Sequence, residues 1–177
     1  MRLFVAIDLP KEVKDYLYNL QKGIGSQNAK IKWVDKKNLH LTLKFLGEVD
    51  ETKIENLKQK LECINVNGFE AKLSKIGAFP NESKINVVWA GVEPEDKVIE
   101  LQKLVDVETL DFGDLKLGSH ITLGRVKLVK NKDKFKSKLR EIKLKDLTFS
   151  VGSFCLFRSV LSKDGPTYSL VRRYGFN

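Results

Sequence analysis

The sequence of 177 residues predicts an α+β fold built from two related lobes. Alternating apolar segments predict strands, and longer segments with apolar residues every three or four positions predict helices. An apolar strand, a helix, a strand with a His-x-Thr motif and a second helix occur from Leu3 and again from Val87. This order predicts a pseudo-two-fold duplication, with two antiparallel sheets flanking a central cleft and the helices outside. No linker-like stretch divides the halves, so we expect one bilobal domain over residues 1–177.

The first lobe begins with an apolar run at residues 2–8, which predicts a buried strand. Pro10 suits the first turn of the following helix, where an amide hydrogen would have no partner. The apolar face of that helix consists of Val13, Leu17, Leu20 and Ile24. Segment 30–34 predicts a strand, and a polar turn leads into the next strand, predicted at 39–46 and closed by Gly47.

The middle of the chain predicts a helix and a hairpin. Thr52 and Glu55 match a capping box at the start of the helix. The helical stripe that follows consists of Ile54, Leu57, Leu61 and Ile64. Segments 69–79 and 84–92 predict two strands joined by a turn at 80–83.

The second lobe continues with a helix that Pro94 opens. Its apolar side consists of Val98, Leu101, Leu104 and Val105. An irregular segment at 107–118 leads into a strand predicted at 119–126. A lysine-rich helix is predicted within 127–145, and three short strands follow between 147 and 174. The inward residues of the lysine-rich helix are predicted to be Phe135, Leu139 and Ile142.

The only two histidines of the chain lie in matching strand contexts, His40-Leu41-Thr42-Leu43 and His120-Ile121-Thr122-Leu123. Residues i and i+2 of a strand project from the same face, so His and Thr project together in each motif. Two such strands facing one another present two imidazoles and two hydroxyls to one cleft. The alternative is that both histidines are ordinary surface or core residues.

These groups suit acid–base chemistry on a phosphate without a metal ion. An imidazole titrates near pH ~6.5, so one can be protonated while the other is free. Such a pair can deprotonate a nucleophile and protonate a leaving group. Thr42 and Thr122 supply uncharged donors for non-bridging phosphate oxygens, although threonine is also a favoured strand residue.

Strand alternation predicts the directions in which three side chains beside the motifs project. Strict alternation turns Arg125 away from His120, but a bulge at Gly124 would turn it back, and both orientations remain open. By the same parity, Lys44 is expected on the face of His40 and Phe45 in the core.

The net charge of +9 arises from 32 basic and 23 acidic residues. This excess favours anionic partners, with nucleic acid first and an acidic membrane surface second. A heat-adapted composition is an alternative source of lysine, but ion pairing alone does not explain the surplus. The lysines expected to form a path for RNA around the motifs are Lys32, Lys36, Lys37, Lys44, Lys127 and Lys130.

Cys63 and Cys155 lack the close spacing of zinc-ligand pairs. We therefore expect reduced, packed thiols, and neither a metal ion nor a cofactor. The apolar N-terminal run is too short for a signal peptide, and no segment reaches membrane-spanning length. These features predict a cytoplasmic protein that does not bind membranes.

The motif residues resemble the 2H phosphoesterase superfamily, and within it the RNA 2′,3′-cyclic phosphodiesterases, historically called 2′-5′ RNA ligases. The resemblance runs nearly end to end, in five ordered blocks. These are residues 2–7, Trp33-Val34 with 38–47, Phe79-Pro80 with 88–92, 120–125 and 165–168.

The resemblance implies a bilobal α+β fold and metal-free hydrolysis of an RNA 2′,3′-cyclic phosphate end to a 2′-phosphate. It implies that His40 protonates the departing 3′-oxygen and that His120 is the base for water. It also implies that Thr42 and Thr122 hold the phosphate, with Arg125 matching the family's arginine beside the second motif. In some members it implies reversible 2′-5′ joining of tRNA halves.

One position departs from the family pattern. Many members have proline before the second histidine, where this chain has Ser119. We expect segment 113–119 to be looser as a result, with an effect on substrate fit rather than on the chemistry.

Two other functions stay open at this point. One is a 2H enzyme that acts on a small cyclic nucleotide instead of RNA, and the other is a non-catalytic RNA-binding module with incidental histidines. Modest aromatic content and the lack of an RNP-like motif weaken the latter. We expect a monomer that acts on RNA ends.

Overall fold

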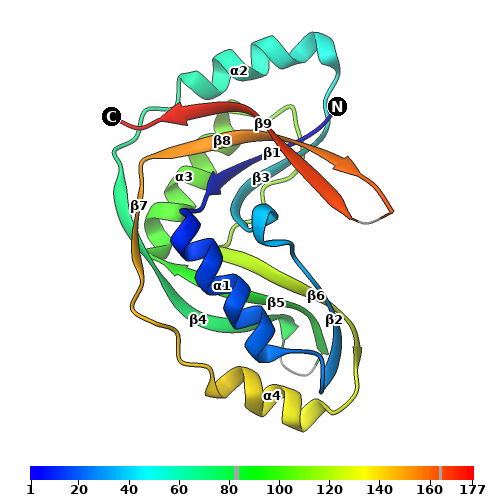
Figure 1. Ribbon diagram of the computed structural model, residues 1–177. Helices are drawn as coiled ribbons and strands as arrows, with labels where there is room; N and C mark the ends of the chain where they lie inside the picture. Colours follow the sequence, from blue (N-terminus) through cyan, green and yellow to red (C-terminus); the bar gives the residue numbers. More distant parts are fainter. Residues whose placement is uncertain (82–83, 164) are drawn as a thin grey trace.

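The computed structural model describes residues 1–81, 84–163 and 165–177 (Figure 1). The helices are α1 (Lys11–Ile24), α2 (Ile54–Glu62), α3 (Glu95–Glu108) and α4 (Lys132–Glu141), with short 3₁₀ turns η1 (Lys36–Asn38) and η2 (Glu51–Lys53). The strands are β1 (Arg2–Asp8), β2 (Ala29–Trp33), β3 (His40–Glu48), β4 (Phe69–Asn81), β5 (Lys84–Glu93), β6 (His120–Val129), β7 (Thr148–Val151), β8 (Ser153–Leu161) and β9 (Pro166–Gly175).

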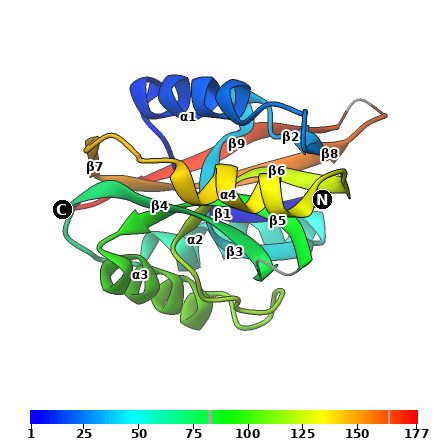
Figure 2. The same cartoon turned by 90° about the horizontal axis from the view of Figure 1, so that it is seen from below.

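The strands form a curled antiparallel sheet in the order β7-β4-β5-β6-β3-β1-β8-β9, with β2 paired to β6. The order is symmetrical about β3 and β6: β1, β8 and β9 follow outward on one side, and β5, β4 and β7 on the other. Helices follow the equivalent strands, α1 after β1 and α3 after β5, and lie on opposite sides of the sheet in Figure 2. The predicted α+β class and pseudo-two-fold duplication are confirmed.

The two expected sheets are continuous in the structure. Among the described residues, β3 and β6 share one registered pair, Leu41 with Ile121. Both side chains are buried in the core, where apolar contact holds the strands together. Beyond this pair, β3 continues alongside β1 and β6 continues alongside β5, so each motif belongs to a different lobe.

Tertiary pairing overrides the predicted start of the lysine-rich helix. Strand β6 runs to Val129 because β2 pairs along it, from Trp33 opposite Gly124 to Ala29 opposite Val129. Helix α4 therefore begins only at Lys132, after Asn131, whose side chain accepts the amide hydrogen of Lys134.

Two predictions about the other helices are wrong. Asp50, rather than Thr52, caps the segment before α2, because its carboxylate accepts both the amide and the hydroxyl hydrogen of Thr52. In α3, Leu104 is 36% exposed, whereas Gln102 is buried. The face of α3 that packs on β3 thus carries a polar residue.

Three remaining predictions have mixed outcomes. The turn expected at 80–83 lies partly outside the described residues. Cys155 is buried as a packed thiol, but Cys63 is exposed, so the expectation of packed thiols is wrong for Cys63. Among the described residues, no helix is long and apolar enough to cross a membrane.

Candidate active site

The β3–β6 junction brings the two His-x-Thr motifs together. Because the strands are antiparallel and Leu41 faces Ile121, the register places His40 opposite Thr122 and Thr42 opposite His120. All four side chains are half-buried and lie on the sheet face opposite to the buried pair. Each histidine thus lies across from the threonine of the other motif.

His40 is held in one orientation by the backbone of the preceding turn. Its Nδ1 lies 2.7 Å from the carbonyl oxygen of Asn38, which can only accept a hydrogen bond. Nδ1 therefore carries the hydrogen, and Nε2 lies 2.9 Å from Oγ1 of Thr42. The rings of Phe4 and Tyr168 flank the imidazole, with centroids at 5.0 and 5.4 Å.

His120 is held by ring contacts from its own lobe. The centroid of Phe79 lies 4.9 Å from the imidazole in an edge-to-face arrangement, and that of Trp89 lies at 6.0 Å. A Cβ atom at Gly118 would come within 3.0 Å of Nδ1 of His120. The close approach of the backbone at residue 118 therefore favours glycine there.

Both imidazoles are shifted toward their neutral form. Burial lowers the pKa of His40, partly opposed by its bond to the Asn38 carbonyl, and the charge of Lys14 lowers it further. Burial alone lowers the pKa of His120. A nearby anion, such as a phosphate, would oppose this shift and favour the protonated form of each imidazole.

A bulge follows each motif and reverses the strand parity. In β3 the pairing steps from Ala6–Thr42 to Val5–Lys44, and in β6 it steps from Trp89–Thr122 to Val88–Gly124. One extra residue, Leu43 or Leu123, is accommodated each time.

The bulge in β6 turns the exposed side chain of Arg125 into the cleft, as the expectation of a bulge at Gly124 required. The bulge in β3 makes the expected orientations of Lys44 and Phe45 wrong. Lys44 is buried, with Nζ 2.6 Å from Oδ1 of Asp106 and 2.9 Å from the carbonyl oxygen of Thr109. Phe45 is 54% exposed and lines the cleft.

The cleft has a volume of about 140 Å³. It is lined by Lys32, Trp33, Val34, Asp35, Asn38, His40, Thr42, Phe45, Thr122, Arg125, Gly165, Pro166 and Tyr168. Four of the five predicted site residues therefore meet in it, and the fifth, His120, lies across from Thr42. The hairpin of β8 and β9 extends beyond β1 and β3 in Figure 1, and Tyr168 of β9 lines the cleft.

Sequence reasoning missed several lining residues. The turn residues Gly165 and Pro166 and the ring of Tyr168 belong to the fifth block of the resemblance, which could have indicated them. Asn38 also contributes its side chain, which donates to the Pro166 carbonyl at 2.8 Å and ties the β8–β9 hairpin to the turn before β3. Asn38 and Phe45 lie in the second block, 38–47, but strand alternation placed Phe45 in the core, because the bulge that exposes it leaves no mark in the sequence.

Two buried glutamines bind the motif strands from the helices. Gln102 of α3 donates to the carbonyl oxygens of Thr42, at 3.2 Å, and Gly118, at 3.0 Å, and accepts the amide hydrogen of Gly118. Gln21 of α1 donates to the carbonyl oxygens of Leu123 and Val34. Each helix is thereby hydrogen-bonded to the motif strand of the opposite lobe.

The expected looseness before the second motif is not found at residues 118 and 119. The hydroxyl of Ser119 donates to the Val92 carbonyl at 2.6 Å, and the Val92 amide donates back to the Ser119 carbonyl at 3.1 Å. Together with the bonds between Gln102 and Gly118, these contacts tie the backbone of residues 118 and 119 to β5 and α3.

The sequence is similar to a known family and, over nearly its whole length, to named proteins. Residues 7–89 match the family described as LigT like Phosphoesterase. An RNA 2′,3′-cyclic phosphodiesterase of Methanocaldococcus jannaschii is 36% identical, with 98% of this chain and 100% of that protein aligned. A protein of the same name from Methanothermobacter thermautotrophicus is 33% identical over 96% of this chain and 95% of its own.

Solved structures are similar over nearly the whole chain. TT0787 of Thermus thermophilus superposes with a TM-score of 0.76 at 28% identity, covering 99% of this chain and 97% of its own. The Escherichia coli LigT structure complexed with 3′-AMP superposes with a TM-score of 0.77 at 26% identity, with the same coverage.

Proposed function

The chain belongs to the LigT-like phosphoesterases of the 2H superfamily, and from this premise we propose that it hydrolyses RNA 2′,3′-cyclic phosphate ends to 2′-phosphomonoesters. The observation that carries the proposal is the register at Leu41 and Ile121, which sets each histidine opposite the other motif's threonine. Relatives named RNA 2′,3′-cyclic phosphodiesterase support the substrate class.

In the proposed reaction, His120 takes a proton from a water molecule, whose oxygen attacks the phosphorus. The bond from phosphorus to the 3′-oxygen breaks, and His40 gives its proton to that oxygen. The 2′-ester bond remains, so the product is a 2′-phosphate. One proton moves from water to His120 and one from His40 to the product, and exchange with solvent restores both imidazoles.

The geometry of His40 supports its role as the acid. With Nδ1 donating to the Asn38 carbonyl, a proton gained on binding of the phosphate goes to Nε2, on the side of Thr42. Thr42 and Thr122 are proposed to donate hydrogen bonds to the non-bridging oxygens, and the planar guanidinium of Arg125 to bind an anionic oxygen.

Two finer features belong to the same proposal. The two imidazoles supply both proton transfers, so the chemistry requires no metal ion. A 5′-hydroxyl of a second RNA that replaces the attacking water gives a 2′-5′ linkage, and this would join tRNA halves reversibly. We further propose that the chain acts as a monomer in the cytoplasm, where it meets RNA ends.

Incubation of the purified protein with 2′,3′-cyclic AMP, with and without EDTA, tests the proposal. We expect 2′-AMP as the product and an unchanged rate in EDTA. Formation of 3′-AMP would contradict the assigned bond cleavage, and loss of activity in EDTA that a divalent ion restores would indicate a metallohydrolase. Tight RNA binding with no turnover of either a cyclic nucleotide or a cyclic RNA end would favour the RNA-binding module.

A further inference from the structure

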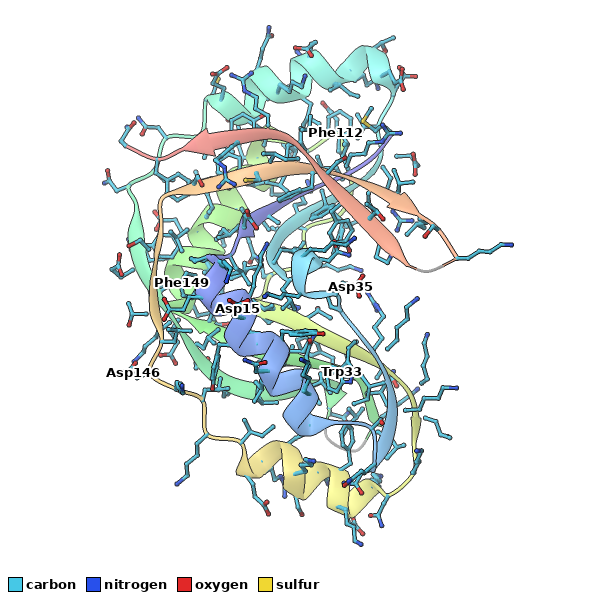
Figure 3. The ribbon with its side chains drawn as sticks, viewed as in Figure 1. Asp15, Trp33, Asp35, Phe112, Asp146 and Phe149 are labelled. Carbon is cyan, nitrogen blue, oxygen red and sulfur yellow. The ribbon has the colours of Figure 1, made fainter. Side chains whose placement is uncertain are left out.

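A second groove continues from the catalytic cleft along α1. It has a volume of about 640 Å³, against about 140 Å³ for the cleft itself. Its lining residues are Leu9, Lys11, Lys14, Tyr18, Trp33, Val34, Asp35, Lys36 and Lys37. Trp33, Val34 and Asp35 line both spaces, so the groove and the cleft share a wall. Figure 3 labels Trp33 and Asp35 on this wall and Asp15 on α1 beside it.

The groove is basic. Four lysines and one aspartate, Asp35, line it, and one of these lysines, Lys14, is paired with Asp8, with its Nζ 2.7 Å from Oδ1. Lys11 and Lys36 both pair with the same carboxylate, Asp15, which holds their ammonium groups at the rim. Lys37 is exposed, and no carboxylate among the described residues pairs with it. A surface of this sign attracts anionic chains such as a phosphodiester backbone.

Aromatic rings accompany the lysines. Tyr18 on α1 is 37% exposed, and the ammonium of Lys22 lies 4.4 Å from the centroid of its ring. The half-buried ring of Trp33 lies on the wall shared with the cleft. Grooves that bind single-stranded nucleic acid combine cations, which contact phosphates, with aromatic rings, on which bases stack.

We infer that this groove, between α1 and residues 33–37, binds the nucleotides of a single-stranded RNA that adjoin the terminal nucleotide in the catalytic cleft. The inference rests on the proposed function and adds the path of the substrate outside the reacting phosphate. Continuity with the cleft, positive charge and the exposed ring of Tyr18 carry it together.

A second basic patch provides the matched control. Lys84, Lys127, Lys130 and Lys132 line another groove, at β5 and β6. That groove shares no lining residue with the catalytic cleft and has no aromatic lining among the described residues. Although the sequence pattern predicted Lys127 on a path for RNA, this exposed residue lies outside the path inferred from the structure, and its removal changes the net charge by the same amount as removal of Lys37.

The test compares two substrates, 2′,3′-cyclic AMP and a short oligoadenylate that ends in a 2′,3′-cyclic phosphate. For Tyr18→Ala and Lys37→Ala we expect kcat/KM on the oligonucleotide to fall about tenfold, with the mononucleotide unchanged. Tyr18→Phe keeps the aromatic face and should retain the wild-type value. Binding of RNA phosphates by lysines weakens as salt rises, so the logarithm of the affinity for the oligonucleotide should fall linearly with the logarithm of the salt concentration. Lys37→Ala should make this slope shallower by about 0.7, while Lys127→Ala should leave it unchanged.

Three results would overturn the inference: an unchanged oligonucleotide rate in both variants, an equal loss on both substrates, or the same loss in Lys127→Ala. Affinity for the same oligonucleotide, measured by fluorescence anisotropy, gives a readout that does not require turnover. Failure of the wild-type protein to hydrolyse 2′,3′-cyclic AMP would count against the proposed function. A Tyr18→Ala effect on anisotropy would then still support the groove, and no effect would reject it.

Discussion

Phe45 and Arg125 occupy equivalent positions of the two lobes. Each lies five residues after the histidine of its motif, and each follows a bulge that turns its side chain into the cleft. The duplication is therefore broken in chemistry at this point, because one lobe presents an aromatic ring and the other a guanidinium. The guanidinium suits the phosphate, and the ring suits an apolar or stacking part of the substrate.

Arg125→Ala should lower kcat/KM on 2′,3′-cyclic AMP by about 10- to 100-fold, the usual effect of a lost charge-assisted hydrogen bond. Arg125→Lys should restore only part of the loss, because an ammonium cannot form two parallel bonds to an anion. Steady-state kinetics of both variants check this. Wild-type rates in both variants would show that Arg125 is an exposed residue that does not bind the phosphate.

Gln102→Met should separate positioning from binding. The variant keeps the side-chain volume but leaves the carbonyl oxygens of Thr42 and Gly118 without their shared donor. We expect the free energy of unfolding to fall by about 1–3 kcal/mol and kcat to fall more than KM rises, because both motifs lose a common support. Urea denaturation and kinetics measure the two effects. A stability loss with wild-type kcat would restrict Gln102 to a structural role.

The pH dependence should follow the lowered pKa values of both histidines. The productive free enzyme has one neutral and one protonated imidazole, and this form is most populated between the two pKa values. Since burial lowers both below about 6.5, kcat/KM should peak in the acidic range and decline as the pH rises through neutrality. Bound phosphate favours the imidazolium, so kcat should peak at higher pH. A kcat/KM that still rises above neutral pH would contradict this.

The motif residues could be predicted from the sequence because two short patterns, each with the period of a strand, used every histidine of the chain. Gly124 also signalled the bulge that turns Arg125 toward the cleft. The equivalent bulge at Leu43 carries no glycine, so alternation placed Lys44 and Phe45 on the wrong faces.

Other features depend on contacts between distant segments. The pairing of β2 with β6 extends that strand through a lysine-rich segment that by itself favours a helix. The roles of Gln21 and Gln102 arise from carbonyl groups that only the folded chain brings within reach. Local patterns cannot indicate such partners, because tertiary contacts override weak local preferences.

The central claim is that two histidines act as one acid–base pair, and the most direct measurement is kcat on 2′,3′-cyclic AMP for His40→Ala, His120→Ala and the double variant. General acid or base catalysis contributes about 10²–10⁴-fold, so each single variant should lose at least this factor. The double variant should be little worse than either single one, because neither histidine completes the reaction alone. Near wild-type turnover in either single variant, or losses that multiply in the double variant, would contradict the account.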